Sequence, residues 1–566
     1  MNYESYFLSS RRGLHPVRAH IQYLEGRMQG PDIYAIVGGG ILAGLLLTRA
    51  VYTSLTNLFS LWVPRHLTLP VVAHRHRFWG PWTRASVFLH LLFIAANVFL
   101  VFFRVTSLSS AGHRTGELAL INLILPLSTN HLSHLADLLG ITLRTCRKLH
   151  RTSGWMGFAL LSFHVVAAAQ APGFSFSLKE VKNLWTMIAG ISLSLLAILS
   201  IQWLRRLSYE VFLRTHQALA GLFVYGTWRH LPAASRHSRV YLLVAVGIFG
   251  FTSLLQFPTF LYRNGLCAVH GSPRALVSFT ARKSENEGPV ATASHIRILL
   301  PRPVKVEAGQ YINLWVPTVS LWSWAQTHPF TVTSWSKGEQ QTMELLVEPH
   351  RGFSADLLRY ADGAMDGSVS FLALFTGPHG TVIDASHYES VLVVAGGFGI
   401  AAAIPHLKRL IHGYNTYTSL VRRLHLVWQV ESIDEVAAAR HLLNNLLDDD
   451  ILDAGYVCLP TISKKSPSIL HISMFVRSGL EQKKVPFGEH ERACLYQGVP
   501  DYQQIMALEA SGEEIERPSN VQNDKGGLLV MVSTTAEIRD QLRDTVRGYI
   551  YEGVKLVELE YQPGVA

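Results

Sequence analysis

Cysteine is scarce in this sequence, and the spacing of the few cysteines excludes the common cysteine chemistries. Zinc ribbons and thioredoxin-like redox proteins carry cysteines in close pairs, two residues apart. This chain of 566 residues has no such pair among its four cysteines, Cys146, Cys267, Cys458 and Cys494. We therefore expect reduced thiols with a structural role.

A basic surface for nucleic acid is also missing. The formal net charge is +10, but the basic residues form no stripe interleaved with aromatic side chains, which is the pattern typical of nucleic-acid binding. Much of the positive excess consists instead of arginines beside long apolar segments. We expect no nucleic-acid partner.

Long apolar runs are absent from the second half of the chain and frequent in the first. A helix needs about 20 apolar residues to cross a bilayer. No such run follows residue 262, where charge rises with short strand-like and helix-like patterns. The first run begins too far from Met1 to resemble a removable signal peptide. We expect a lipid bilayer as partner and seven spans, near residues 33–52, 86–104, 117–140, 150–170, 185–204, 212–230 and 240–260.

Basic residues in the loops between these runs predict an orientation. They gather after the first, third and fifth runs, and the opposite loops hold fewer. The positive-inside rule then places the N-terminus outside and the C-terminal half in the cytosol, although four arginines in the N-terminal tail oppose this assignment. The basic loops contain Arg65, Arg75, Arg77, Arg84, Arg144, Arg147, Lys148, Arg205, Arg206 and Arg214.

Four histidines form two pairs with the same spacing inside apolar segments. His150 and His164 are fourteen residues apart, and so are His216 and His230. Fourteen residues make about four helical turns, so both members of a pair face nearly the same side, roughly 21 Å apart. A single histidine on an apolar helix usually serves packing, but the duplicated spacing predicts two levels of paired imidazoles, as in bis-histidine haem sites.

Glycines lie between the histidines of each pair. They allow close approach of a flat macrocycle, but helix packing explains them equally well. They are Gly154 and Gly157 in the first segment and Gly221 and Gly226 in the second.

Residues 273–385 alternate in short strand-like patterns with turn signals, which predicts a small antiparallel barrel. Two motifs in it are candidates for cofactor binding: HPFT, from His328 to Thr331, and HRGFS, which contains Gly352 and Ser354 before a helical stretch. Gly352 and Ser354 at a helix N-terminus suit a pyrophosphate. A simple N-cap role explains Ser354 as well.

A strand, a glycine turn and a helix follow in the segment VLVVAGGFGIAAAIPHLKRL, from Val391 to Leu410. This order predicts entry to a doubly wound nucleotide-binding fold, although the full GxGxxG pattern is missing. Strand patterns at Leu424–Val430 and Gly527–Ser533 continue the α/β alternation, and we interpret 431–525 as containing an insertion. The turn residues of interest are Gly396, Gly397, Gly399 and Ile400.

Taken in chain order, these motifs resemble the fungal ferric reductase family, which is related to the NADPH oxidases. The two histidine pairs, His328-Pro329-Phe330-Thr331 and the turn Gly396-Gly397-Phe398-Gly399-Ile400 match the family's haem, flavin and nucleotide motifs. The resemblance implies a ferredoxin-reductase-like half, with an FAD barrel and an α/β domain for NADPH or NADH, joined to a helical bundle with two b-type haems. It also implies a plasma-membrane location.

The resemblance sets the expected domain bounds. Residues 1–85 form a tail, the first span and a loop, and residues 86–262 form the haem-binding transmembrane domain. Residues 263–385 form the FAD domain, and residues 386–566 form the nucleotide domain. In this arrangement the four histidines bind haem iron, Thr331 hydrogen-bonds the isoalloxazine, and Gly352 and Ser354 lie near the pyrophosphate.

The late part of the chain departs from the family's pattern. Val532-Ser533-Thr534 replaces a Cys-Gly-Pro motif, Val499 and Glu431 stand where basic residues are usual, and the terminal aromatic residue is missing unless Tyr561 serves. Ser533 remains a candidate for nucleotide contact. We expect weaker discrimination in favour of NADPH, with Arg422 and Arg423, or Lys464 and Lys465, as substitute partners for a 2′-phosphate.

Three functions fit these features. The first is electron transfer from NAD(P)H through FAD and two haems to a ferric or cupric chelate on the outer side. The second is an oxidase that reduces O₂ to superoxide, and equal histidine spacings favour the first over it. The third is a haem protein fed by a partner. The sequence leaves the oligomeric state open.

Overall fold

The computed structural model describes residues 35–40, 62–76, 80–207, 209–266, 271–282, 290–319, 323, 326–349, 352–362, 368–450, 468–488, 490–515 and 526–561. The chain divides into two compact units, which we describe separately. The first comprises Met1–Ser60, His76–Asn130 and Arg147–Ser253, and the second comprises Leu61–Arg75, His131–Cys146 and Leu254–Ala566.

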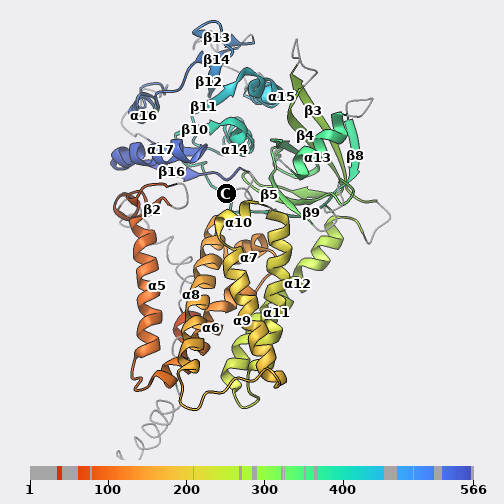
Figure 1. Cartoon of the computed structure of the whole chain (residues 1–566). Coiled ribbons are helices and arrows are strands. Elements are labelled where there is room, and N and C mark those ends of the chain that lie inside the picture. Colours follow the sequence, from red (N-terminus) through yellow and green to blue (C-terminus); the bar gives the residue numbers. More distant parts are fainter. Residues whose placement is uncertain are drawn as a thin grey trace, which may run out of the picture. The chain divides into compact units, whose positions relative to one another are not determined.

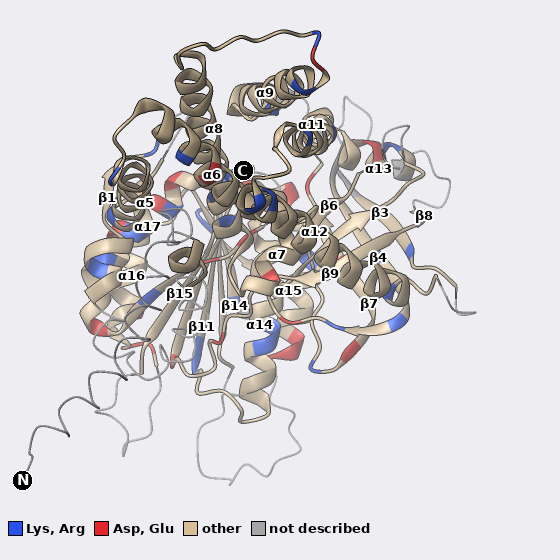
Figure 2. Ribbon diagram, turned by 90° about the horizontal axis from the view of Figure 1, so that it is seen from below, with Lys and Arg blue, Asp and Glu red and all other residues tan. Residues whose placement is uncertain are grey.

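Long helices build the first unit (Figure 1). Polar residues begin two of them, since the Thr83 and Ser107 hydroxyls accept hydrogen bonds from Ser86 N and Ser110 N, which satisfies otherwise free N–H groups. Almost all of the ribbon of these helices is tan in Figure 2, because few charged residues lie along them. The helices are α5 (Arg84–Phe102), α6 (Leu108–Leu127), α8 (Leu143–Ala169), α9 (Val181–Leu199), α10 (Gln202–Leu207), α11 (Tyr209–His230) and α12 (Arg236–Arg263). The first four residues of α8 and the part of α12 from Leu254 on belong to the second unit.

Four of the described helices, α5, α8, α9 and α12, are long and apolar enough to cross a membrane. On α5 large apolar side chains point outward, and Phe88 and Leu91 are each 61% exposed. Such a surface is unfavourable in water and suits acyl chains. The expected first span lies mostly outside the described residues, so seven spans are not established.

The expected span at 117–140 is not one helix. α6 ends at Leu127, and a separate short helix, α7 (Leu132–Leu139), follows and ends at Gly140 in the left-handed conformation. The polar stretch from Ser128 to His131 interrupts the apolar run. The error came from joining two apolar segments across four polar residues, and α7 belongs to the second unit.

In the second unit, two antiparallel sheets enclose one apolar core, as a small barrel does. Their strand orders are β7-β4-β3-β8 and β6-β5-β9. Ile298, Leu314 and Met343, from three of these strands, meet in the core and are fully buried. The elements are β3 (Arg274–Arg282), β4 (Val290–Lys305), β5 (Tyr311–Trp315), β6 (His328–Thr331), β7 (Glu339–Val347), α13 (Phe353–Asp362), β8 (Ser368–Leu372) and β9 (Leu374–His379).

A seven-stranded sheet follows, in the order β13-β14-β12-β11-β10-β15-β16, and all neighbours except β13 and β14 are parallel. The strand order reverses at β10, which has β11 on one side and β15 on the other. In doubly wound sheets ligands bind where the order reverses. The strands are β10 (Ser390–Gly396), β11 (Arg423–Ser432), β12 (Leu470–Ser478), β13 (Lys484–Phe487), β14 (His490–Gln497), β15 (Leu528–Ser533) and β16 (Val554–Glu558).

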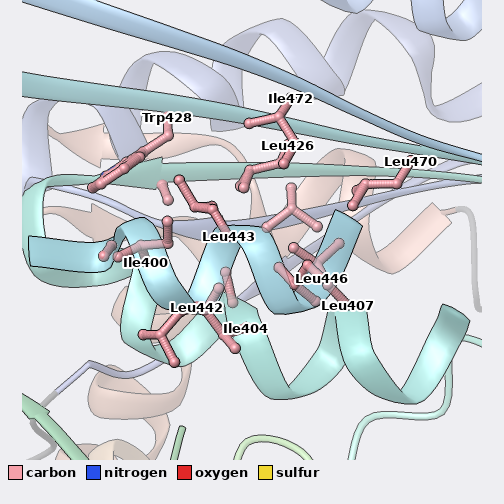
Figure 3. Close-up of a cluster of buried hydrophobic side chains, with 14 of the residues drawn as sticks. Ile400, Ile404, Leu407, Leu426, Trp428, Leu442, Leu443, Leu446, Leu470 and Ile472 are labelled. Atoms are coloured by element: carbon pink, nitrogen blue, oxygen red, sulfur yellow. The ribbon is translucent and has the colours of Figure 1, made fainter. Parts of the chain in front are cut away.

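Helices cover both faces of this sheet, because β10 alternates its side chains between them. Val391 and Val393 join the core with α14 (Ile400–Asn415) and α15 (Ile433–Asp449), which Figure 3 shows around Leu426 and Leu443. Leu392 joins the opposite core with α16 (Tyr502–Ser511) and α17 (Ala536–Tyr549).

The segment 431–525 is more than an insertion. Its described residues supply α15, β12, β13, β14 and α16, so most of them are regular parts of the sheet and its covering helices. Our interpretation missed them because β12 alternates buried and half-buried side chains rather than forming a continuous apolar run. Residues 451–467 and 516–525 lie outside the described residues.

A buried charge cluster fixes α16 to the amino end of the sheet. Glu509, whose side chain is fully buried, receives two hydrogen bonds from Arg423 Nε and Nη2, at 2.9 and 2.8 Å, and lies 2.8 Å from His425 Nδ1. Burial by itself would raise the pKa of Glu509, but the bonds from His425 and Arg423 outweigh it and lower that pKa to about 2.

We expect Glu509→Ala to destabilise the second unit by about 3–5 kcal/mol, because it leaves the Arg423 guanidinium buried without its partner. Thermal unfolding of the purified protein measures the loss. As a control, the paired replacement Arg423→Met and Glu509→Leu should recover most of it, since apolar residues of similar volume replace buried ion pairs well. Equal melting temperatures for Glu509→Ala and the wild type would contradict the assignment.

The same cluster predicts an acid limit to stability. The carboxyl of Glu509 has a lower pKa in the folded than in the unfolded chain, so its contribution is complete above about pH 4.5 and disappears as the pH falls toward 2. The melting temperature of Glu509→Ala should therefore depend less on pH in this range than that of the wild type.

Candidate functional site

The structure brings the four candidate histidines together as two facing pairs. His150 and His164 lie on α8, and His216 and His230 lie on α11. The ring centres are 6.2 Å apart for His150 and His216 and 6.4 Å apart for His164 and His230. We call these the first and the second histidine pair.

These separations fit a metal ion between the rings. Two imidazoles on opposite sides of one ion are separated by two metal–nitrogen bonds of about 2 Å and two ring radii of roughly 1 Å, or about 6 Å between ring centres. Among the described residues no group of three or more His, Cys, Asp or Glu side chains could hold a metal. Two protein ligands alone suit an ion whose other positions a macrocycle fills.

The glycines between the histidines divide into two kinds. A Cβ at Gly154 or Gly221 would meet no atom within 4 Å, so these positions face open space. A Cβ at Gly157 would lie 2.7 Å from the Leu123 side chain, and one at Gly226 would lie 3.0 Å from Ala189 Cβ. Packing thus explains one glycine of each helix, and the other leaves room for a flat group.

The residues expected to bind flavin lie side by side. His328, Pro329, Phe330 and Thr331 form β6, and the His328 ring stacks on Phe353 with ring centres 4.3 Å apart. Burial lowers the pKa of His328 to about 4, so the ring is neutral at neutral pH. Phe330 and Thr331 are buried.

Phe353 links β6 to the second flavin motif. It is the first residue of α13, between Gly352 and Ser354. Gly352 has a φ of 87° and its carbonyl accepts a hydrogen bond from Asp356 N, so Gly352 takes the position before the helix. The N-cap interpretation of Ser354 was therefore wrong, and Ser354 lies buried in the first turn.

The C-terminal segment contacts β6, the strand that contains the HPFT motif. The Thr331 hydroxyl donates to the Glu560 carbonyl at 3.2 Å, and Glu348 N donates to the Tyr561 hydroxyl, also at 3.2 Å. Burial raises the pKa of Tyr561 well above its ordinary value. Tyr561, which the sequence suggested as a substitute for a terminal aromatic, thus bonds the residue after β7, and its neighbour Glu560 contacts Thr331 of the flavin motif.

The nucleotide-turn residues meet where the strand order reverses. Gly396 ends β10, Gly397 to Gly399 form a short 3-10 helix, and Ile400 begins α14. A Cβ at Gly399 would lie 2.1 Å from the carbonyl oxygen of Ser533, at the end of β15, so only glycine fits there. The third glycine of dinucleotide turns has this packing role.

The expected substitutes for a 2′-phosphate partner are at the wrong end of the sheet. Arg423 pairs in register with Ser390 at the start of β10, whereas the glycine turn follows the end of that strand. Arg422 immediately precedes Arg423, and Arg423 is committed to the Glu509 cluster. Lys464 and Lys465 lie outside the described residues. The interpretation failed because sequence position alone did not tell which end of the strand faces the turn.

An ion pair that the sequence did not suggest lies at the carboxyl ends of β11 and β12. Arg477 Nη1 lies 3.3 Å from Glu431 Oε1, and both side chains are more than half exposed. Ser432 is opposite Ser478 in the register. Arg477 belongs to no sequence motif, and only the pairing of β12 with β11 shows that it lies beside Glu431.

Sequence reasoning also missed a contact between α7 and the barrel. The Asp137 carboxylate lies 2.6 Å from His379 Nδ1 and accepts a hydrogen bond from Gly380 N at 2.9 Å. His379 belongs to the GPHG segment at the end of β9. The GPHG segment is unusual enough in the sequence to draw attention to His379. Its partner Asp137, however, lies 242 residues away, so the sequence gives no sign of this contact.

Three family models match the chain in succession. Residues 115–227 match the ferric reductase like transmembrane component, residues 286–383 an FAD-binding domain, and residues 388–473 the ferric reductase NAD binding domain. His150, His164 and His216 lie within the first match, and His230 lies three residues beyond it.

Curated relatives agree with these models. Ferric reductase transmembrane component 4 of Saccharomyces cerevisiae is 26% identical over 259 residues, 45% of this chain and 32% of the relative. Probable cell surface ferric reductase kap2 of Aspergillus oryzae is 23% identical over 340 residues, 56% of this chain and 43% of the relative. The matched part thus spans less than half the length of these relatives.

Among solved structures, a flavohemoglobin from Malassezia yamatoensis is 12% identical with a TM-score of 0.34, over 80% of this chain and 99% of that one. A score this low does not establish a shared fold. The fold and the matched domains define the class: a membrane-spanning helical domain followed by FAD-binding and NAD-binding domains. Within that class, the matched domains and the curated relatives are those of ferric reductases, to which this chain is similar at 23–26% identity.

Proposed function

We propose that this protein transfers electrons across a membrane from NAD(P)H to a ferric or cupric chelate. The observation that carries the proposal is the pair of facing imidazoles at each of two levels, 6.2 and 6.4 Å apart. Two such levels on helices of the membrane domain suit a two-haem path. The names of relatives, which include a ferric/cupric reductase of Saccharomyces cerevisiae, supply the acceptor class.

The residues have distinct tasks in this proposal. His150 and His216 would hold one haem iron, and His164 and His230 would hold the other, while the open space at Gly154 and Gly221 would leave room for the macrocycle. When bound, the flavin would supply hydride chemistry and the haems single-electron chemistry, so the redox chemistry would belong to the cofactors. The apolar helices around the histidines exclude water from them.

The soluble domains position the flavin and the nucleotide. We assign Thr331 of β6 to the isoalloxazine, which it would meet as a hydrogen-bond acceptor because its hydroxyl proton goes to the Glu560 carbonyl. We assign the start of α13, with Gly352 and Ser354, to the pyrophosphate, since a helix N-terminus suits an anion. We assign the turn from Gly396 to Gly399, with Ser533, to the nucleotide, because doubly wound sheets bind ligands where the strand order reverses. The basic loops favour a cytosolic C-terminal half, and the cell surface relative favours the plasma membrane.

An acceptor panel tests the function. Purified full-length protein in detergent, supplied with NADH or NADPH, is expected to reduce ferric and cupric chelates faster than O₂. Superoxide as the main product would favour the oxidase alternative. Absence of haem from the purified protein would contradict the proposal.

We expect Ser354→Ala to weaken FAD binding about 10- to 150-fold, because a hydrogen bond to a charged group contributes about 1.5–3 kcal/mol. Fluorescence titration of the deflavinated full-length protein with FAD measures this. Ser336→Ala is the matched control, since that hydroxyl bonds Gly338 in an exposed turn. Equal affinities for Ser354→Ala and the wild type would refute the contact.

A further inference from the structure

The second histidine pair has hydrogen-bond partners on neighbouring helices. His164 Nδ1 lies 2.7 Å from the Gly112 carbonyl oxygen on α6, and His230 Nδ1 lies 2.7 Å from Thr186 Oγ1 on α9. In the first pair, Nδ1 of His150 and of His216 is buried with no hydrogen-bond partner in the described part of the chain. The two levels share a spacing but differ in their surroundings.

The acceptors determine where the imidazole protons lie. A backbone carbonyl can only accept, so His164 Nδ1 carries a proton. The Thr186 hydroxyl donates its single proton to the Lys182 carbonyl at 2.9 Å, so it accepts from His230 Nδ1. Both rings therefore present an unprotonated Nε2, which is the form that binds a metal.

Small residues bring α6 to the His164 ring. A Cβ at Gly112 would lie 2.7 Å from Ala167 Cβ, and a Cβ at Gly116 would lie 3.0 Å from His164 Nδ1. Gly112 and Gly116 are four residues apart, the spacing that allows close helix packing in membranes. The close approach places the Gly112 carbonyl within reach of the ring.

A similar approach brings α9 to His230. A Cβ at Gly226, one turn before His230, would lie 3.0 Å from the Trp185 carbonyl oxygen and 3.0 Å from Ala189 Cβ. Trp185 and Ala189 flank Thr186 on α9. His164 and His230 are thus each hydrogen-bonded by a different neighbouring helix. In both cases a glycine near the hydrogen bond allows the helices to approach closely.

We propose that Thr186 and the Gly112 carbonyl are positioning groups for the second haem, which fix the tautomer and rotation of His230 and His164 and strengthen both as ligands. The proposal rests on the proposed function, since it presupposes haem between these rings. An acceptor on Nδ1–H increases the electron density at Nε2. A more basic ligand stabilises the ferric state, so these bonds lower the midpoint potential of the second haem.

Thr186→Val tests the proposal, because valine keeps the shape of threonine and removes the acceptor. Redox titration of the purified full-length protein, followed in the haem spectrum, should show one of two components shifted to higher potential and the other unchanged. Thr186→Ser, which keeps the hydroxyl, is the matched control and should titrate like the wild type.

The outcomes separate the two proposals. A wild type without haem overturns the proposed function. Two haems with unchanged potentials in Thr186→Val overturn the positioning role alone, as does an equal shift, or an equal loss of haem, in Thr186→Ser and Thr186→Val. Loss of one haem in Thr186→Val but not in Thr186→Ser supports the role, because then the hydroxyl is needed to hold the ligand.

Discussion

His164→Ala is expected to abolish electron transfer through the second histidine pair while leaving the first pair intact. The second histidine pair keeps only His230, and two protein ligands are needed to hold a low-spin haem between the helices. Substitution of groups that merely orient a metal ligand costs about 10- to 100-fold in affinity or activity. Loss of the ligand itself should therefore lower acceptor reduction by roughly 100-fold or more.

Three measurements on purified full-length His164→Ala protein check this. The reduced-minus-oxidised haem spectrum should lose about half of its amplitude, chelate reduction should fall to background, and flavin reduction by NAD(P)H should keep its rate. His113→Ala is the control, since His113 is an exposed histidine of α6. A spectrum unchanged by His164→Ala would refute the assignment of the second pair.

The wild type is expected to prefer NADH or to discriminate little between the nucleotides, and Glu431→Gln should shift the preference toward NADPH by about 10- to 100-fold. An acidic side chain at the end of the second strand of a doubly wound sheet accepts the ribose 2′-hydroxyl of NADH. It also repels a 2′-phosphate, and like charges in contact cost several kcal/mol. Glu431 has this position on β11, and its carboxylate holds Arg477, 3.3 Å away.

The ratio of kcat/KM for the two nucleotides measures the shift. Removing the Glu431 charge also frees Arg477 to bind a phosphate, so adding Arg477→Ala to Glu431→Gln should reduce the gain to the part that comes from lost repulsion. Arg422→Ala is the control, because Arg422 lies at the opposite end of the strand. Strong NADPH preference in the wild type, or a change of preference in Arg422→Ala, would contradict this geometry.

The sequence determined those features that depend on local periodicity. Fourteen residues between histidines place both on one face of any α-helix, and the strand–glycine–helix order at Val391–Leu410 required only neighbours in the chain. The antiparallel sheets of 273–385 followed from alternation and turn residues in the same way. These predictions agree with the elements observed.

Tertiary structure decided the partners that lie far apart in the chain. The hydrogen bond from His164 to Gly112 joins residues 52 apart, the bond between Thr186 and His230 joins residues 44 apart, and Arg477 meets Glu431 only because β12 pairs with β11 in parallel. The parallel pairing of β11 with β10 likewise places Arg423 at the end of the sheet opposite to the nucleotide turn. Periodicity along one segment predicts the face that a residue occupies, but only packing between segments determines which group it meets there.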